Sequence, residues 1–151
     1  MATRNRVDVI HGVNFEVLER REPAHYGGLS LRELERRIEG YAAPLGLVTT
    51  FFQTNSEGAF VERLHAASAN ADAIILNPGA WTHYAWAIHD ALAVAGVPAV
   101  EVHLSDIESR EPWRRLSVIR ELCIESVVGL GVEGYRLALE RLARELRERS
   151  P

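Results

Sequence analysis

The chain has 151 residues, of which 47% are hydrophobic and 25% are charged, which is typical of one globular domain that buries its own core. Its formal net charge of -4 argues against nucleic acid as a partner, and no apolar run approaches the ~20 residues of a membrane helix. The one cysteine, Cys123, excludes an internal disulfide and fits a reducing compartment, so we expect a cytoplasmic protein that does not bind membranes.

Short apolar runs alternate along the chain with longer segments of helical periodicity. Helices are predicted over 30–45, 56–70, 81–95 and 134–149; the first two begin at the N-cap residues Ser30 and Ser56, and the third ends at Gly96. Strands are predicted over 7–10, 47–52, 73–76, 99–103 and 124–128. Strands separated by helices of this length pair in parallel through right-handed crossovers.

This alternation predicts an α/β fold, a flavodoxin-like doubly wound five-stranded parallel sheet in three layers. We expect a single domain over 1–151. The chain alone does not fix the strand order, of which 2-1-3-4-5 is the commonest. Ligands of such sheets bind outside the carboxyl ends of the strands, and polar clusters follow the first, third and fourth strands here. We therefore expect these clusters to converge at one edge.

The connection after the first strand is long for a compact α/β fold, and we interpret about 15–28 as a lid over the ligand edge. It carries Arg21 and Tyr26, and the two glycines that follow would let it close and reopen. A guanidinium stabilises a neighbouring phenolate, so Tyr26 is a candidate general base. A surface loop with a salt-bridged arginine and a packing tyrosine is the alternative interpretation.

The fourth strand carries Glu101 and His103 two residues apart, so that both side chains lie on one face. A carboxylate beside an imidazole fixes its tautomer and supports the imidazolium, which makes His103 a candidate general acid. A buried histidine with a satisfied partner is the alternative.

Three further groups are weaker candidates for holding a ligand. The amide of Asn77 ends the third strand before Pro78, and His83 lies near the predicted start of a helix, where anions are favoured; a helix cap explains this stretch almost as well. Arg110 and Arg114 are spaced one helical turn apart and could hold hydroxyls or a carboxylate, although solvated arginines are commoner.

Two other patterns indicate no site. The segment Gly129-Leu-Gly131-Val-Glu-Gly134 matches G-x-G-x-x-G, but it follows the last strand, so the second strand and ribose-binding acid of a dinucleotide site are missing. The chain has six histidines, yet no HExxH motif or cysteine pair accompanies them. The sequence therefore predicts no metal and no other cofactor.

The chain resembles the type II 3-dehydroquinate dehydratases from Val7 to about Leu142. The resemblance is carried by six blocks in order: Gly12-x-Asn14, Arg21-Glu22-Pro23-x-x-Tyr26-Gly27, Phe52-Gln53-x-Asn55-Ser56-Glu57-Gly58, Asn77-Pro78-Gly79-Ala80-x-Thr82-His83, Glu101-Val102-His103-x-Ser105 and Gly129-Leu-Gly131. It implies the flavodoxin-like fold, assembly into trimers that build a dodecamer, and anti elimination of water through an enolate, without metal or Schiff base.

The resemblance also implies a role for each site residue. Tyr26 would take the C2 proton with Arg21 activating it, and Asn14 would hold the water that stabilises the enolate. His103, oriented by Glu101, would protonate the departing C1 hydroxyl. Asn77, His83 and Arg114 would bind the substrate through their side chains, and Leu104 and Ser105 would bind it through their backbone. Arg110 would close the lid, and Asp90 would reach across the trimer contact.

Nine positions depart from the usual family pattern, and we expect them to cluster at the pocket: His11, Val13, Phe15, Tyr84, Ala85, His89, Asp106, Pro112 and Leu116. Changed polar partners in a site can alter specificity sharply. Our first hypothesis is a 3-dehydroquinate dehydratase that forms 3-dehydroshikimate in the shikimate pathway or in quinate breakdown. A diverged relative that dehydrates another cyclic β-hydroxy ketone in secondary metabolism, and a catalytically idle binding protein, are the alternatives.

Overall fold

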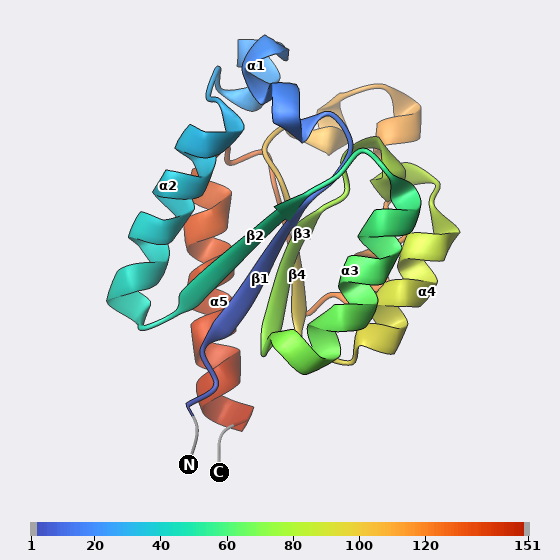
Figure 1. The fold of residues 1–151 in the computed structure, drawn as a ribbon. Helices are drawn as coiled ribbons and strands as arrows, with labels where there is room; N and C mark the ends of the chain where they lie inside the picture. Colours follow the sequence, from blue (N-terminus) through green and yellow to red (C-terminus); the bar gives the residue numbers. More distant parts are fainter. Residues whose placement is uncertain (1–2, 150–151) are drawn as a thin grey trace.

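The computed structural model describes residues 3–149, and the predicted domain of 1–151 extends two residues beyond them at each end. Five parallel strands form one sheet in the order β2-β1-β3-β4-β5 (Figure 1). Their bounds are β1 Arg6–His11, β2 Val48–Gln53, β3 Ala73–Asn77, β4 Ala99–His103 and β5 Glu125–Val128. This is the flavodoxin-like order, so the predicted fold class is confirmed.

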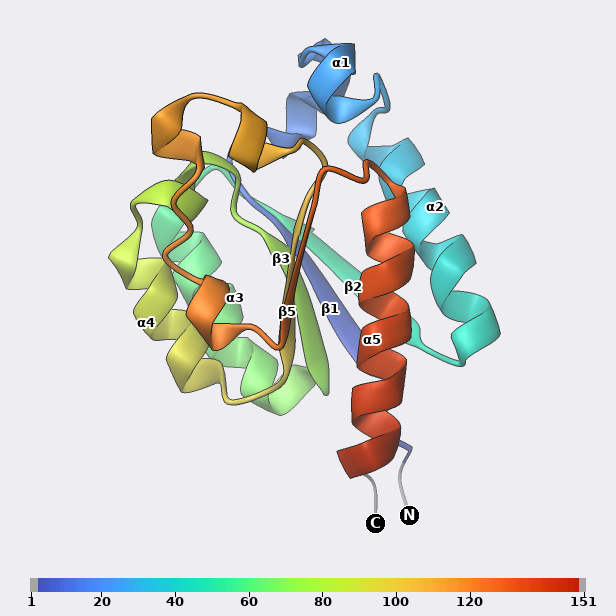
Figure 2. The same ribbon diagram turned by 180° about the vertical axis from the view of Figure 1, so that it is seen from behind.

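Helices cover both faces of the sheet and bury a separate core on each. On one face lie α2 (Leu31–Ala42) and α5 (Glu133–Arg149), and on the other lie α3 (Glu57–Asn70) and α4 (Trp86–Ala95) (Figures 1 and 2). The central strand β3 is buried along its whole length, as an apolar strand covered on both faces must be. None of the helices within residues 3–149 has the length and apolarity needed to cross a membrane.

The N-caps predicted for two of these helices are confirmed. The side chain of Ser30 accepts a hydrogen bond from the backbone N–H of Glu33, and that of Ser56 accepts one from Ala59. The first predicted helix is shorter than expected, because α2 ends at Ala42 and a 3-10 turn, Ala43–Leu45, follows it.

The helix predicted over 81–95 is wrong in its first turn. A 3-10 helix covers Gly79–His83, and α4 begins only at Trp86. In a continuous helix the carbonyl of Thr82 would accept from the N–H of Trp86, but it accepts instead from Val118, at 2.8 Å. This tertiary hydrogen bond diverts the chain, and His83 therefore lies in the 3-10 segment.

The segment 15–28 is more regular than a loop. A 3-10 helix, Phe15–Arg20, is followed by a short helix α1, Pro23–Tyr26, which lies above the carboxyl end of the sheet (Figure 1). Gly27 ends α1 with a φ of +78°, a conformation that side chains other than glycine rarely adopt. We refer to residues 15–28 as the lid segment.

Gly12 lets the ends of β1 and β3 meet. Its N–H donates to the carbonyl of Asn77 at 2.8 Å, and a Cβ at this position would stand 2.2 Å from the carbonyl oxygen of Pro78. The turn after β3 therefore depends on the missing side chain at position 12.

We expect Gly12→Ala to lower the free energy of unfolding by about 1–3 kcal/mol, because the added methyl group must displace backbone rather than a flexible side chain. Urea denaturation measures the loss. Gly40→Ala is the matched control: Gly40 lies in α2 with open space around it, and alanine there should stabilise by about 0.5–1 kcal/mol. Equal stability of the two variants would contradict the close approach.

Candidate active site

A pocket opens at the carboxyl ends of the strands, between the lid segment, the turn after β3 and the chain that follows β4. Ten of the twelve predicted site residues line it: Asn14, Arg21, Tyr26, Asn77, His83, His103, Leu104, Ser105, Arg110 and Arg114. Phe15, Gly79, Ala80 and Ile107 complete the wall. The three polar clusters thus converge, as expected for this fold.

Tyr26 is held by two arginines, one near it in the sequence and one far from it. Arg21 donates to its phenol oxygen at 2.8 Å, and the guanidinium carbon of Arg21 lies 4.3 Å from the ring centre. Arg110 donates to the same oxygen at 2.7 Å and to the hydroxyl of Ser105 at 3.3 Å. Two guanidinium groups on one oxygen would stabilise negative charge that develops there.

Arg110 and Arg114 do not share a helix. Two short 3-10 helices, Ile107–Ser109 and Pro112–Arg114, occupy this stretch, and Arg110 lies between them with an extended backbone. Pro112 begins the second of these and cannot donate the hydrogen bond that a continuous helix would need. The expected spacing of one helical turn is therefore wrong, although both side chains reach the pocket.

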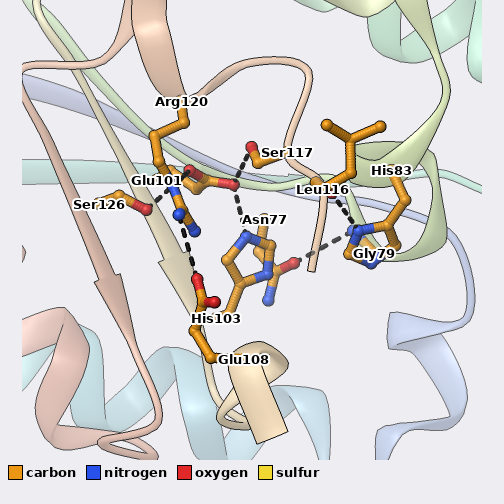
Figure 3. Close-up of polar contacts among 10 residues, drawn as sticks. All are labelled: Asn77, Gly79, His83, Glu101, His103, Glu108, Leu116, Ser117, Arg120 and Ser126. Atoms are coloured by element: carbon orange, nitrogen blue, oxygen red, sulfur yellow. Dashed lines mark hydrogen bonds and ion pairs between the residues drawn. The ribbon is translucent and has the colours of Figure 1, made fainter. Parts of the chain in front are cut away.

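Glu101 and His103 form a buried pair on β4 (Figure 3). The Nε2 atom of His103 lies 2.6 Å from Oε2 of Glu101, whose side chain is fully buried. Burial would raise the pKa of Glu101, but the hydrogen bond and charge of His103, with hydrogen bonds from two serines, outweigh it and lower the pKa to about 2. His103 itself lines the pocket, so Glu101 acts from behind it.

His83 presents an acceptor to the pocket. Its Nδ1 lies 2.6 Å from the carbonyl oxygen of Leu116, which can only accept, so Nδ1 carries the hydrogen (Figure 3). Burial lowers the pKa of His83 and keeps the ring neutral, which leaves Nε2 as an acceptor. The ring stacks on His103 at 6.5 Å and meets the edge of Trp113 at 5.3 Å.

Two asparagines form the floor near β1 and β3. Asn14 has a φ of +71°, and its N–H donates to the side-chain oxygen of Asn55 at 2.9 Å. Gln53, at the end of β2, donates to the same oxygen at 3.2 Å and to the carbonyl of Gly12 at 3.1 Å. Asn77 accepts from the N–H of Gly79 at 3.1 Å. The block at the end of β2 therefore fixes the backbone of Asn14.

Asp90 is not brought into the pocket. It lies on α4 with a largely exposed side chain, 2.9 Å from Nδ1 of His89, and the other ring nitrogen of His89 pairs with Glu121. Among residues 3–149 its partner is His89, which is not one of the predicted site residues.

The nine positions that depart from the family pattern do not cluster at the pocket as expected. Phe15 lines it, but the other eight are not among the lining residues of the pocket. His11 is buried beneath it, Tyr84 and Leu116 are exposed, and Asp106 accepts from the N–H of Glu108 at the start of a 3-10 helix. Leu116 contacts His83 of the site through its backbone carbonyl oxygen, and any residue at this position would supply the same group.

Sequence reasoning missed several residues that shape the site. Ser117 and Ser126 donate to Glu101, Trp113 packs on His83, and Asn55 holds Asn14. Asn55 lies in one of the blocks that carry the family resemblance, and this signal could have identified it. No local sequence pattern marks the two serines as partners of Glu101. Residues 3–149 hold no group of three or more His, Cys, Asp or Glu side chains placed to bind a metal ion.

We expect His83 to stay neutral at pH values where an ordinary histidine, with a pKa near ~6.5, is half protonated. Its pKa is lowered, so the neutral form with a hydrogen on Nδ1 persists as the pH falls through this range. Long-range ¹H–¹⁵N spectra of the histidine rings measure this directly. His89 is the internal control, because its two carboxylate partners raise its pKa. Protonation of His83 before His89 would contradict the assignment.

Comparison with known proteins places the chain among close relatives. The family model for class II dehydroquinase matches residues 5–143. A 3-dehydroquinate dehydratase of Syntrophotalea carbinolica is 47% identical over 135 residues, which cover 89% of this chain and 91% of that protein. A catabolic 3-dehydroquinase of Emericella nidulans is 46% identical and covers 89% and 88%.

A solved structure agrees with these sequence matches. The type II dehydroquinase of Propionibacterium acnes superimposes with a TM-score of 0.89 at 38% identity, over 95% of this chain and 99% of that one. Both the sequence and the arrangement of the elements therefore match over nearly the whole length, and this chain belongs to the class II dehydroquinase family.

Proposed function

We propose that this protein catalyses the dehydration of 3-dehydroquinate to 3-dehydroshikimate by an anti elimination through an enolate. The observation that carries the proposal is the placement of Tyr26 and His103, each with its own charged partner, on the wall of one pocket. A base and an acid on one ligand are what an elimination of water needs.

In the proposed reaction the phenolate of Tyr26 removes the C2 proton, and the electron pair moves into the C2–C3 bond as the C3 carbonyl becomes an enolate. Asn14 lines the pocket and would hold the water that stabilises the enolate oxygen. As the carbonyl reforms, the C1–O bond breaks and the imidazolium of His103 protonates the departing hydroxyl, which leaves as water. Both proton-transfer groups return to their starting states when the proton on Tyr26 passes to His103 through solvent.

The remaining polar groups suit a substrate with one carboxylate and several hydroxyls. Arg114 brings a positive charge to the pocket wall, and Asn77 and His83 bring neutral polar groups to it. The Nε2 atom of His83 is an acceptor, so it would receive a hydrogen bond from a substrate hydroxyl. This division favours a polyhydroxylated acid over an apolar ketone.

The location of the divergent residues supports 3-dehydroquinate rather than another cyclic β-hydroxy ketone. Substrate discrimination comes from side chains that contact the ligand, and eight of the nine departures do not line the pocket. The ninth, Phe15, replaces the usual apolar leucine with another apolar side chain. Relatives that are 46–47% identical are named for 3-dehydroquinate. An idle binding protein would have no need for the complete set of base, acid and charged partners.

We also propose that residues 1–151 act as one domain in the cytoplasm, with the lid segment closed over the pocket by the contact between Arg110 and Tyr26. The chain would assemble as trimers, four of which build a dodecamer. Tyr84, Trp86, Trp113 and Leu116 are each about half exposed or more, and they surround the outer wall of the site near Asp90. If a neighbouring subunit covered this surface, Asp90 of one subunit would lie close to the pocket of the other.

We expect Trp86→Glu to lower the assembly mass measured by light scattering, because a carboxylate would be buried without a partner at the trimer contact. Val48→Glu is the control: Val48 is similarly exposed but begins β2, at the end of the sheet opposite the pocket. A wild-type monomer, or a Trp86→Glu protein of unchanged mass, would refute this interface.

We expect Tyr26→Phe and His103→Ala each to reduce turnover of 3-dehydroquinate by at least ~100-fold, as removal of a general base or acid typically does. The conjugated enone of the product absorbs in the ultraviolet and reports the rate. Tyr41→Phe and His65→Ala are matched controls, because these residues lie on α2 and α3, away from the pocket. Activity that survives both site substitutions removes the mechanism; a wild-type protein that binds but does not convert 3-dehydroquinate favours another substrate.

A further inference from the structure

The carboxylate of Glu101 is surrounded by neutral donors as well as by His103. The hydroxyl of Ser117 donates to Oε2 at 2.6 Å, and the hydroxyl of Ser126 donates to Oε1 at 2.7 Å (Figure 3). Ser126 stands directly beside Glu101 in the pairing of β4 with β5, whereas Ser117 comes from the segment that follows Arg114. Two separate parts of the chain thus bring hydroxyls to one buried carboxylate.

A buried carboxylate and imidazole that share one proton have two arrangements. In the ionic one the proton is on His103 and Glu101 is charged; in the neutral one the proton is on Glu101. Burial favours the neutral arrangement, because charges lose their hydration there. A hydroxyl that donates to a carboxylate favours the ionic arrangement, because its hydrogen bond is stronger to the charged form.

We propose that Ser117 and Ser126 are positioning residues that keep the shared proton on His103 rather than on Glu101. The inference rests on the proposed function, in which the imidazolium of His103 delivers this proton to the departing hydroxyl. Neither serine lines the pocket, so both act through Glu101. Their hydroxyls also fix the carboxylate plane, so that Oε2 faces Nε2 of His103.

The other titratable groups around the pair leave this task to the serines. Arg120 places Nε 3.7 Å from Oε1, beyond hydrogen-bond distance, and its Nη1 donates to Glu108 at 3.2 Å, so its charge is shared with a second carboxylate. Burial, with the charge of Glu101, raises the pKa of Cys123 to about 12. His83 is neutral, because its pKa is lowered chiefly by burial and also by the charges of His103 and Arg114.

The experiment compares Ser117→Ala, Ser126→Ala and the double variant with the wild type. Each single change should lower kcat for 3-dehydroquinate about tenfold, the order expected for losing one hydrogen bond to a charged group, while KM stays unchanged. Ser117→Thr and Ser126→Thr keep the hydroxyl, so each of these variants should retain the wild-type kcat. Ser68→Ala, on the exposed face of α3, is the control.

The decisive readout is the ¹⁵N spectrum of the His103 ring at neutral pH, assigned by its absence in His103→Ala. Both ring nitrogens should carry protons in the wild type, and one should lose its proton in the double variant. Ser126→Cys keeps the side-chain size with only a weak donor, so it must show part of the same change even if the alanine variants fold poorly. A cationic His103 in the folded double variant, or a neutral one in the wild type, overturns the inference.

This readout needs no turnover, so it separates the inference from the proposed function. A wild type that fails to convert 3-dehydroquinate while the ring signals change as expected refutes the function alone. A loss of kcat in the alanine variants without a change in the ring signals refutes the inference alone.

Discussion

The site depends on a carboxylate that has been removed from water. Glu101 is fully buried at the end of β4, and a lone charge there would be strongly unfavourable. His103 and two serine hydroxyls make the burial tolerable, and they hold the carboxylate ionised. A buried pair of this kind is weak evidence for stability. Its value is directional, because it holds the ring of His103 in one orientation at the wall of the pocket.

The part of the pocket wall that carries Tyr26 is assembled differently. Tyr26 lies on the lid segment, and its oxygen meets Arg110, which is 84 residues away in sequence. Arg110 also donates to Ser105 beside the carboxyl end of β4. The contact of Arg110 thus joins the lid segment to the chain that follows β4. In the proposed mechanism this contact would hold the base in place, and closing the lid segment would exclude water from the reaction.

The sequence predicted the sheet and most of the site because its signals are local. Alternation placed Glu101 and His103 on one face, capping residues marked α2 and α3, and the rule for parallel sheets brought three distant clusters together. It failed at the start of α4, where a tertiary contact overrides a local pattern, because the N–H of Val118 donates to the carbonyl of Thr82. It also failed at Arg110 and Arg114, where the local residue Pro112 prevents the expected helical spacing. Ser117 and Ser126 could not be found, because a serine carries no sign of the carboxylate it meets.

One divergent residue, His11, lies behind the pocket wall and has a partner there. His11 ends β1 beside Asn77, fully buried, where the family pattern has a neutral amide. Its Nε2 pairs with Glu35 of α2 at 3.0 Å, and its ring stacks between Phe15 and Phe51. The helix behind the sheet thus supplies the partner that the new side chain needs. His11 itself does not line the pocket, so its side chain is accommodated behind the wall that Phe15 and Asn77 form.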